Sequence, residues 1–480
     1  MTDGHRIFRN FSALMLAQLV SNIAGLLSTA YLARVLLPEG FGILGWGIAL
    51  LGYLGLVVNP GVDRHAVREI ARDPDLLQGM TGNVIGFRLV VALLLYLVLA
   101  AVILFFGPDG LKGTVLLVQA TGLFVTAITI DFSFQAMQRM GAIAWRQIAT
   151  SLLILAGVFV FVADAGDVPV AAAVSMLASA IAAIGMLCTF ARTQPGFRPR
   201  LEFPVIREMV KKSLPVALAA FLTAIFISAD IVMLGLLAGD HEVGLYTAAA
   251  RIFILAVMPA TMIGTAFLPH LAATKDDADA RQSAMTLHAK ALLLFGIMVV
   301  AGGIACVSPL IALLFGPAFS GAEIIVTLLF CATGLAYFRL CLDAPLMAWG
   351  QDNWRIRALG IGAAANILLN LYLIPLYAGE GAAIATIISE LVVLAILMVN
   401  RGWFRLLPVL WLQARAVALT LLAAWLVMTL TPADAGNISA LLWASVLVIG
   451  VAFTGALALR IASFSTLARI LRSSAAPPQA

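Results

Sequence analysis

Charged side chains are scarce in this chain: Asp, Glu, Lys and Arg make up 11% of its 480 residues, whereas hydrophobic residues make up 62%. Soluble domains carry roughly a quarter charged residues, so this composition excludes a soluble protein with a buried core. The apolar residues come in windows of about 20, long enough to cross a hydrocarbon core of roughly 30 Å as a helix. Within lipid such segments must be helical, because every backbone polar group needs an internal partner. The sequence therefore predicts an all-α, polytopic membrane protein.

Cysteine and histidine are also few, at four and five residues. The cysteines (Cys188, Cys306, Cys331 and Cys341) lie in apolar windows without CxxC spacing, which is typical of packing residues. The chain has no P-loop and no nucleophile–base constellation, so we expect neither an enzyme nor a bound metal or cofactor. Membrane topology accounts for the net charge of +5, so no nucleic-acid partner is expected.

The apolar windows predict about fourteen transmembrane helices. Their expected ranges are 11–33, 42–58, 84–106, 114–134, 143–163, 168–190, 213–237, 244–268, 288–308, 322–345, 356–376, 380–400, 409–431 and 438–460. The first window follows basic residues but is too long for a signal peptide, and no convincing cleavage site comes after it. It is expected to be a retained span.

The basic residues predict the orientation of these spans. With a cytoplasmic N-terminus, 25 of the 29 Lys and Arg residues fall in inner loops and adjoining helix ends. Arg34 and Lys112 fall at outer ends, and Arg251 and Arg339 fall well within spans. This distribution follows the positive-inside rule and predicts that both termini are cytoplasmic.

One long polar stretch, Ala191–Lys212, separates two apolar halves. It carries six basic residues, two acidic residues and three prolines, and the prolines forbid one continuous helix. We expect a cytoplasmic connector that lies partly on the membrane surface; a solvated linker with no further role is the alternative. The predicted domains are a six-helix lobe at 1–190, the connector at 191–212, a second six-helix lobe at 213–400, two additional transmembrane helices at 401–460 and a cytoplasmic tail at 461–480.

The halves resemble each other at three places. Gly141–Arg146 corresponds to Gly350–Arg355, Ala165–Asp167 to Ala378–Glu380, and Pro38–Gly42 to Asp240–Gly244. The offsets in numbering are 209 (350 − 141), 213 (379 − 166) and 202 (244 − 42). Six spans separate each pair, so both copies have the same orientation in the membrane. Parallel repeats predict two pseudo-symmetric lobes with the substrate route between them.

The first span carries polar and small residues on one helical face. They are Gln18, Ser21, Asn22, Gly25, Ser28 and Thr29. This face could pack closely against another helix through its small residues, or it could form the wall of a cavity, and both explanations remain open. Gln18 and Asn22 favour the cavity, because they are too large for close packing.

Ionisable residues within spans are costly and indicate function or pairing. Asp230 and Arg251 lie at matched depths on two helices joined by a short outer loop, so they could pair. Arg339 and Asp343, four residues apart on one helix, could also pair. The other in-span carboxylates are Asp131 and Glu390. For each of these groups a structural salt bridge and a role in transport remain open.

Six motifs follow one another along most of the chain: Leu32–Gly42, Asp230–Gly235, Val243–Ile252, Phe267–His270, Leu314–Pro317 and Asn366–Glu390. In order and topology they resemble the polysaccharide-type flippases of the multidrug/oligosaccharidyl-lipid/polysaccharide exporter superfamily. The resemblance implies two six-helix lobes around a central cavity that works by alternating access. It implies an undecaprenyl-pyrophosphate-linked oligosaccharide, moved from the cytoplasmic to the periplasmic leaflet of a bacterial inner membrane for surface polysaccharide synthesis.

The resemblance also implies site residues and partners. A cationic cavity would suit a pyrophosphate headgroup. The residues expected to contact substrate are Arg34, Arg88, Arg251, Arg339, Gln18 and Asn22, and the coupling or ion-pair candidates are Asp230, Asp131, Asp343 and Glu390. The expected partners are the lipid-linked oligosaccharide, membrane lipid, H⁺ or Na⁺, and the polymerase and glycosyltransferases of the same pathway.

Other functions remain open beside this one. Drug/cation antiporters of the same superfamily have cavities that lean acidic, and peptidoglycan-precursor flippases fit fourteen spans equally well. A membrane glycan polymerase or ligase is disfavoured, because such enzymes usually carry a large periplasmic loop and the outer loops here are only a few residues long.

The predicted topology can be tested with reporters and labelling. A C-terminal fusion should be active with a cytoplasmic reporter, and a cysteine introduced at Thr193 should resist an impermeant thiol reagent added from outside. A fusion active only in the periplasm, or labelling of Thr193→Cys in intact cells, would contradict the predicted orientation.

Overall fold

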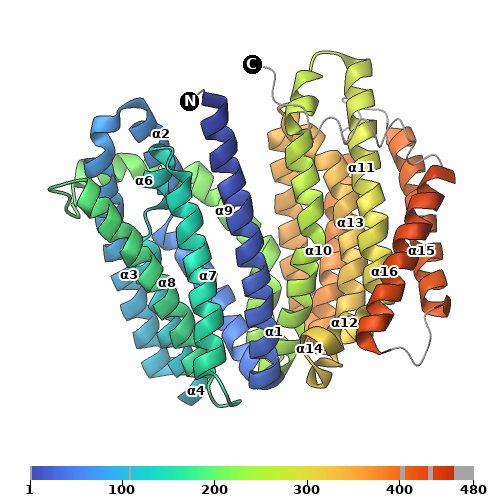
Figure 1. The fold of residues 1–480 in the computed structure, drawn as a ribbon, viewed down its shortest axis with the longest axis horizontal. Helices are drawn as coiled ribbons and strands as arrows, with labels where there is room; N and C mark the ends of the chain where they lie inside the picture. Colours follow the sequence, from blue (N-terminus) through green and yellow to red (C-terminus); the bar gives the residue numbers. More distant parts are fainter. Residues whose placement is uncertain (1–2, 108–109, 400–405, 431–435, 459–480) are drawn as a thin grey trace. The chain divides into compact units, whose positions relative to one another are not determined.

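The computed structural model describes residues 3–107, 110–399, 406–430 and 436–458, and the regular secondary structure of these residues is entirely helical (Figure 1). In the first half the helices are α1 (Asp3–Val58), α2 (Val62–Arg72), η1 (Pro74–Leu76), α3 (Leu77–Phe106), α4 (Gly110–Ala120), α5 (Gly122–Ile128), α6 (Asp131–Ala136), α7 (Met140–Phe161) and α8 (Val168–Thr193). They continue with α9 (Phe203–Leu237), α10 (Asp240–Ala273), α11 (Ala278–Ala305), α12 (Val307–Leu314), η2 (Pro317–Phe319), α13 (Ala322–Ala348), α14 (Asp352–Val399), α15 (Leu406–Leu430) and α16 (Asn437–Ala458). The predicted tail at 461–480 lies outside the described residues.

Ten helical segments of the described chain are long and apolar enough to cross a membrane. Two of them each cover two predicted spans, because α1 breaks at Leu37 (φ 60°, ψ 173°) and α14 breaks at Ala378 (φ 45°, ψ −124°). The predicted fourth span consists of α4, α5 and α6 in succession. The all-helical, multi-pass fold is confirmed, whereas the count of fourteen stays a prediction.

The chain divides into two compact units, Met1–Gly235 and Leu236–Ala480. This division falls after most of α9, whereas the sequence places the boundary between the lobes at 191–212. The contacts of α9 and of the connector within the first unit account for the difference. The assignment of 213–400 to a second six-helix lobe stays a prediction.

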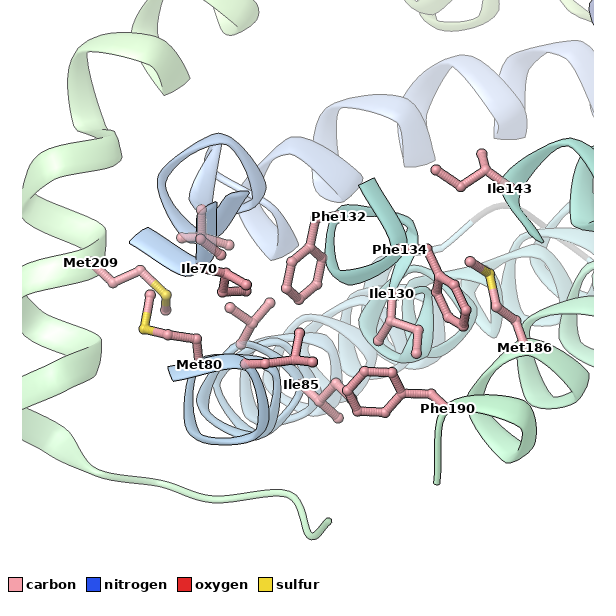
Figure 2. Packing of buried hydrophobic residues seen from close by; sticks show 14 residues of the cluster. Ile70, Met80, Ile85, Ile130, Phe132, Phe134, Ile143, Met186, Phe190 and Met209 are labelled. Carbon is pink, nitrogen blue, oxygen red and sulfur yellow. The ribbon is translucent and has the colours of Figure 1, made fainter. Parts of the chain in front are cut away.

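The first unit has a hydrophobic cluster built from six helices (Figure 2). Phe132 and Phe134 of the short helix α6 point into it, and Phe190 of α8 packs edge-on against Phe134 with ring centroids 6.1 Å apart. Met80 comes from α3 and Met209 from α9. The cluster therefore fixes the beginning of α9 to the first unit.

The connector between α8 and α9 packs closely against α3. The Arg200 amide donates to the Gly82 carbonyl at 3.0 Å, and the Glu202 amide donates to Asn83 Oδ1 at 2.7 Å. A Cβ atom on Gly86 would lie only 2.1 Å from the Arg200 carbonyl oxygen, so the absence of a side chain there permits the close approach. The connector is thus held against the first unit and is not merely a solvated linker.

The end of α9 is also attached to the first unit. Trp46 Nε1 donates to the Val232 carbonyl at 3.1 Å, and the Trp46 ring occupies the space where a Cβ of Gly235 would lie. The Lys112 ammonium stacks 4.3 Å from the centroid of the same ring. These contacts place α9 beside the second part of α1.

The second unit is organised around α13, which packs against α10, α11 and α14. Trp349, at the end of α13, is fully buried and donates from Nε1 to the Leu271 carbonyl at 2.9 Å. The two C-terminal helices α15 and α16 pack on α11 through small residues such as Ala301, Ala423 and Ala444. These two helices correspond to the two spans that the sequence places outside the repeat.

Backbone geometry at the turn around Pro38 supports the internal repeat. Leu37 (φ 60°, ψ 173°) precedes Pro38, and Gly239 (φ 91°, ψ 169°) precedes Asp240. Their offset of 202 (239 − 37) is the one that relates Pro38–Gly42 to Asp240–Gly244 in the sequence. The conformation is essentially reserved for glycine, so the first half holds a leucine in a strained backbone where the second half has glycine.

A second repeated turn connects α6 to α7 and α13 to α14. Gln138 (φ 57°) and Gly350 (φ 78°) occupy the left-handed position, with an offset of 212 (350 − 138). The next amides, of Arg139 and Gln351, donate to Phe134 and Leu346 carbonyls, both at 2.8 Å, which closes a Schellman motif in each half. In the structure the counterpart of Gly350 is therefore Gln138, and the sequence match of Gly350 with Gly141 is wrong. The two matches differ by three positions, because three more residues separate the turn from Trp145-Arg146 in the first half than from Trp354-Arg355 in the second.

The strained turn at Leu37 predicts an unusual effect of glycine. Leu37→Gly should be more stable than Leu37→Ala by about 1–3 kcal/mol, because both variants lose the side chain but only alanine keeps the backbone strain. Thermal unfolding of the purified protein in detergent measures the difference. Equal stability of the two variants would show that the backbone at this turn is not strained.

Candidate functional site

The first part of α1 has three distinct faces. One is apolar and exposed (Leu16, Leu19, Ile23 and Leu27), and one is buried (Ala17, Ala24 and Ser28). The third carries Gln18, which is exposed and donates from Nε2 to Asn22 Oδ1 at 2.9 Å. Gly25 on this face looks into open space, since no atom lies within 4 Å of the place where a Cβ would be. The exposed apolar face suits lipid, and the separate polar face suits contact with water or a polar ligand.

Two of the predicted substrate-contacting arginines have exposed side chains. Arg34 lies on α1 one turn before the break at Leu37, and Arg251 lies in the first half of α10. A phosphate group can approach an exposed guanidinium and bind it at two points. Both arginines therefore remain candidates for contact with an anionic ligand.

Arg88 has a different environment. Its side chain is 1% exposed, forms an ion pair with Asp63 of α2, and donates from Nη1 to the Thr129 carbonyl at 3.2 Å. The Phe132 ring centroid lies 5.5 Å from the guanidinium. Arg88 thus fastens α2 and the α5–α6 segment to α3, and in this conformation it is not open to a ligand.

An Asp–Arg pair occurs at the same place in both halves. Arg146 of α7 binds Asp131 of α6 at two points, 2.7 and 2.5 Å. In the second half, Arg355 of α14 lies 3.6 Å from Asp343 of α13. Asp131 and Asp343 have an offset of 212 (343 − 131), the same as the adjoining turns. In each half the aspartate lies before the turn and the arginine after it, so the ion pair joins the two helices that the turn connects. The pair therefore belongs to the repeated fold.

Arg339 is paired with Glu390 rather than with Asp343, its expected neighbour on the same helix. Nε of Arg339 lies 2.7 Å from Glu390 Oε2, and Nη2 lies 3.4 Å from Oε1. Glu390 is 2% exposed and Arg339 13% exposed. Two of the predicted site residues, from α13 and α14, are therefore in direct contact.

Asp230 is buried on α9 in the first unit, whereas Arg251 lies in the second unit. The Asp230–Arg251 pair stays a prediction.

The sequence did not identify three of the residues that form ion pairs with the predicted site residues: Asp63, Arg146 and Arg355. Arg146 and Arg355 close the repeated Trp-Arg motif, so the repeat itself was the signal that could have identified them. Asp63 lies on an amphipathic helix between two spans, and nothing in its local sequence indicates a partner 25 residues away.

The helical fold, its repeated turns and the charges held within its spans are those of a multi-pass membrane protein. Residues 7–275 match the model of a family described as "Polysaccharide biosynthesis protein", and this match covers more than half of the chain. The chain belongs to this family.

Similarity to individual proteins extends beyond the family match. A "Putative O-antigen transporter" of Shigella dysenteriae is 22% identical over 375 residues, which cover 77% of this chain and 93% of that protein. Among solved structures, "Lipid II flippase MurJ, inward closed conformation" has a TM-score of 0.76 at 14% identity, covering 92% of this chain and 98% of that one. An inward-facing multidrug resistance MATE family transporter of the MOP superfamily has a TM-score of 0.60 at 17% identity, covering 79% and 94%. The two structures share the fold, and all three proteins are named as transporters or flippases, in agreement with the expectation that this chain is not an enzyme.

The buried Arg88 predicts a large effect of removing its partner. Asp63→Asn should lower the free energy of unfolding by about 3 kcal/mol, because it leaves an uncompensated charge in a low-dielectric site. Thermal unfolding in detergent measures this, with Arg72→Gln as the control. Arg72 is 76% exposed and pairs with Glu69, so its loss should cost only about 0–1 kcal/mol. A stable Asp63→Asn protein would show that Arg88 has enough other partners.

Proposed function

We propose that this protein is a flippase that moves an undecaprenyl-pyrophosphate-linked oligosaccharide from the inner to the outer leaflet of a bacterial cytoplasmic membrane. The product would supply surface polysaccharide synthesis. The observation that carries the proposal is the similarity to a protein named as an O-antigen transporter over 93% of that protein's length, together with membership of the polysaccharide biosynthesis family.

The distribution of exposed charge supports an anionic substrate. Among the charged residues of the predicted site, Arg34 and Arg251 have exposed side chains. The carboxylates of Asp131, Asp343 and Glu390 are held in ion pairs with arginines. Exposed guanidinium groups can bind phosphate oxygens at two points, whereas a cationic drug would need exposed carboxylates.

The proposed cycle is alternating access between two pseudo-symmetric lobes. Arg34 and Arg251 would bind the pyrophosphate, and the polar face of α1 with Gln18 and Asn22 would contact hydroxyl groups of the sugars. Movement would be coupled to H⁺ or Na⁺, with both termini in the cytoplasm. A polymerase and glycosyltransferases of the same pathway would use and supply the substrate.

Two other cargoes are compatible with the fold. Similarity to a multidrug transporter favours a cation antiporter, and similarity to a lipid II flippase favours a peptidoglycan precursor. Lipid II and a lipid-linked oligosaccharide both carry a lipid pyrophosphate. The residues that contact the sugars, Gln18 and Asn22, would therefore discriminate between the two substrates, whereas the arginines would not.

Reconstituted protein should translocate a fluorescent undecaprenyl-pyrophosphate-linked oligosaccharide in liposomes, with less effect on lipid II and none on a cationic dye. Arg34→Gln and Arg251→Gln should each lower the rate at least about tenfold, equivalent to ~1.4 kcal/mol of lost stabilisation. Arg251→Lys should recover only part of it, because lysine keeps the charge without the bidentate geometry.

Arg72→Gln serves as the matched control, because this arginine is exposed on α2 and pairs with Glu69 of its own helix. It should translocate at the wild-type rate. Transport of the dye with no transport of the lipid would reject the flippase, and wild-type rates for both arginine variants would remove them from the substrate site.

A further inference from the structure

The second unit contains an ion pair that the repeated fold does not explain. Asp343–Arg355 has its counterpart in Asp131–Arg146, at the same turn of the first half. Arg339–Glu390 has none. By the offset of the Gln138 and Gly350 turns, the counterpart of Arg339 is Ala127 (339 − 212). By the offset of the sequence match at Gly166 and Gly379, the counterpart of Glu390 is Leu177 (390 − 213), which is exposed. The first half thus has two apolar residues at the corresponding places.

The burial of this pair makes its presence costly. Transferring two charges from water into a low-dielectric site costs several kcal/mol per ion, and a hydrophobic pair in its place is often neutral or stabilising. Ala127 is fully buried in its half, so the fold tolerates an apolar residue at this place. The pair is therefore a feature of what the second unit does rather than of how it folds.

The two partners differ in access. Glu390 is 2% exposed, while Arg339 keeps 13% of its side chain exposed, so of the two partners Arg339 is the more accessible to a ligand. Asp343 also acts electrostatically on Arg339 and is itself held by Arg355. Other charged or titratable groups on the packed elements include Glu242, Arg251 and His270 on α10, Arg281, His288 and Lys290 on α11, and Glu380 on α14.

We infer that Glu390 is a proton-binding site, and that Arg339 exchanges its carboxylate partner for the anionic diphosphate of the substrate while Glu390 takes up a proton. In this exchange an O–H bond forms on a Glu390 oxygen with a proton supplied by water. Arg339 has an anionic partner both before and after the exchange. The site thus avoids an unpaired charge at every step. The inference rests on the proposed function for the identity of the anion.

The exchange links the two ligands thermodynamically. Since each diphosphate bound at Arg339 brings one proton to Glu390, the two must increase each other's affinity by the same factor. Where each bound diphosphate brings one proton, diphosphate affinity should rise about tenfold for each unit by which the pH falls. A purely structural ion pair gives no such linkage.

The test uses the full-length protein in detergent with undecaprenyl diphosphate as the probe, between about pH 5 and pH 8. Wild-type protein should take up protons from a weakly buffered solution when the lipid binds, and its affinity should follow pH. Glu390→Gln should bind without proton uptake and without this pH dependence. Glu69→Gln, which removes a carboxylate that pairs with the exposed Arg72 on α2, should keep the wild-type dependence. A Glu390→Gln protein with wild-type proton uptake would overturn the inference.

A second measurement replaces the lipid by inorganic pyrophosphate. Infrared difference spectra on adding pyrophosphate should show the carbonyl stretch of a buried protonated carboxylic acid in wild-type protein and not in Glu390→Gln, and a wild-type spectrum without it overturns the inference. A wild type that shows this band but does not bind the lipid would reject the proposed substrate and leave the proton site standing. If Glu390→Gln does not fold, the double variant Arg339→Gln/Glu390→Gln removes both charges together and should lack the band.

Discussion

A charge inside a low-dielectric helical bundle must have a partner, and much of this structure follows from that requirement. Arg88 with Asp63, and Asp131 with Arg146, each join helices that are separate in the chain. In the second unit, Arg355 and Arg339 do the same for α13 and α14. Because breaking such a pair costs far more than replacing it, the pairs help to fix which helices neighbour one another.

The comparison of the halves separates architecture from activity. Features that occur in both, such as the left-handed turns at Gln138 and Gly350 and the Asp–Arg pair beside each, belong to the shared architecture. Features that occur in one half are candidates for function. Arg339–Glu390 belongs to the second group, because the first half has the uncharged residues Ala127 and Leu177 at the corresponding positions of the sequence.

Sequence patterns predicted the helical fold well and the partners of the charges poorly. Apolar windows of about 20 residues suffice to identify helices that cross lipid, so most spans were found. Arg339 was assigned to Asp343 because only neighbours along one helix are visible from spacing, while its actual partner is 51 residues away. The division after Gly235 depends on Trp46 and Met209 packing against α9, contacts that no local pattern records, and the lobe boundary at 191–212 stays a prediction.

The close contact between the connector and α3 affects how the helices of the first unit can move. The connector's backbone lies against Gly82 and Gly86 of α3, which leaves little slack between α3 and the start of α9. The Trp46 ring contacts the other end of α9 at Gly235. Because both ends of α9 are attached within the first unit, we expect α9 to move together with α3 and α1 rather than independently of them.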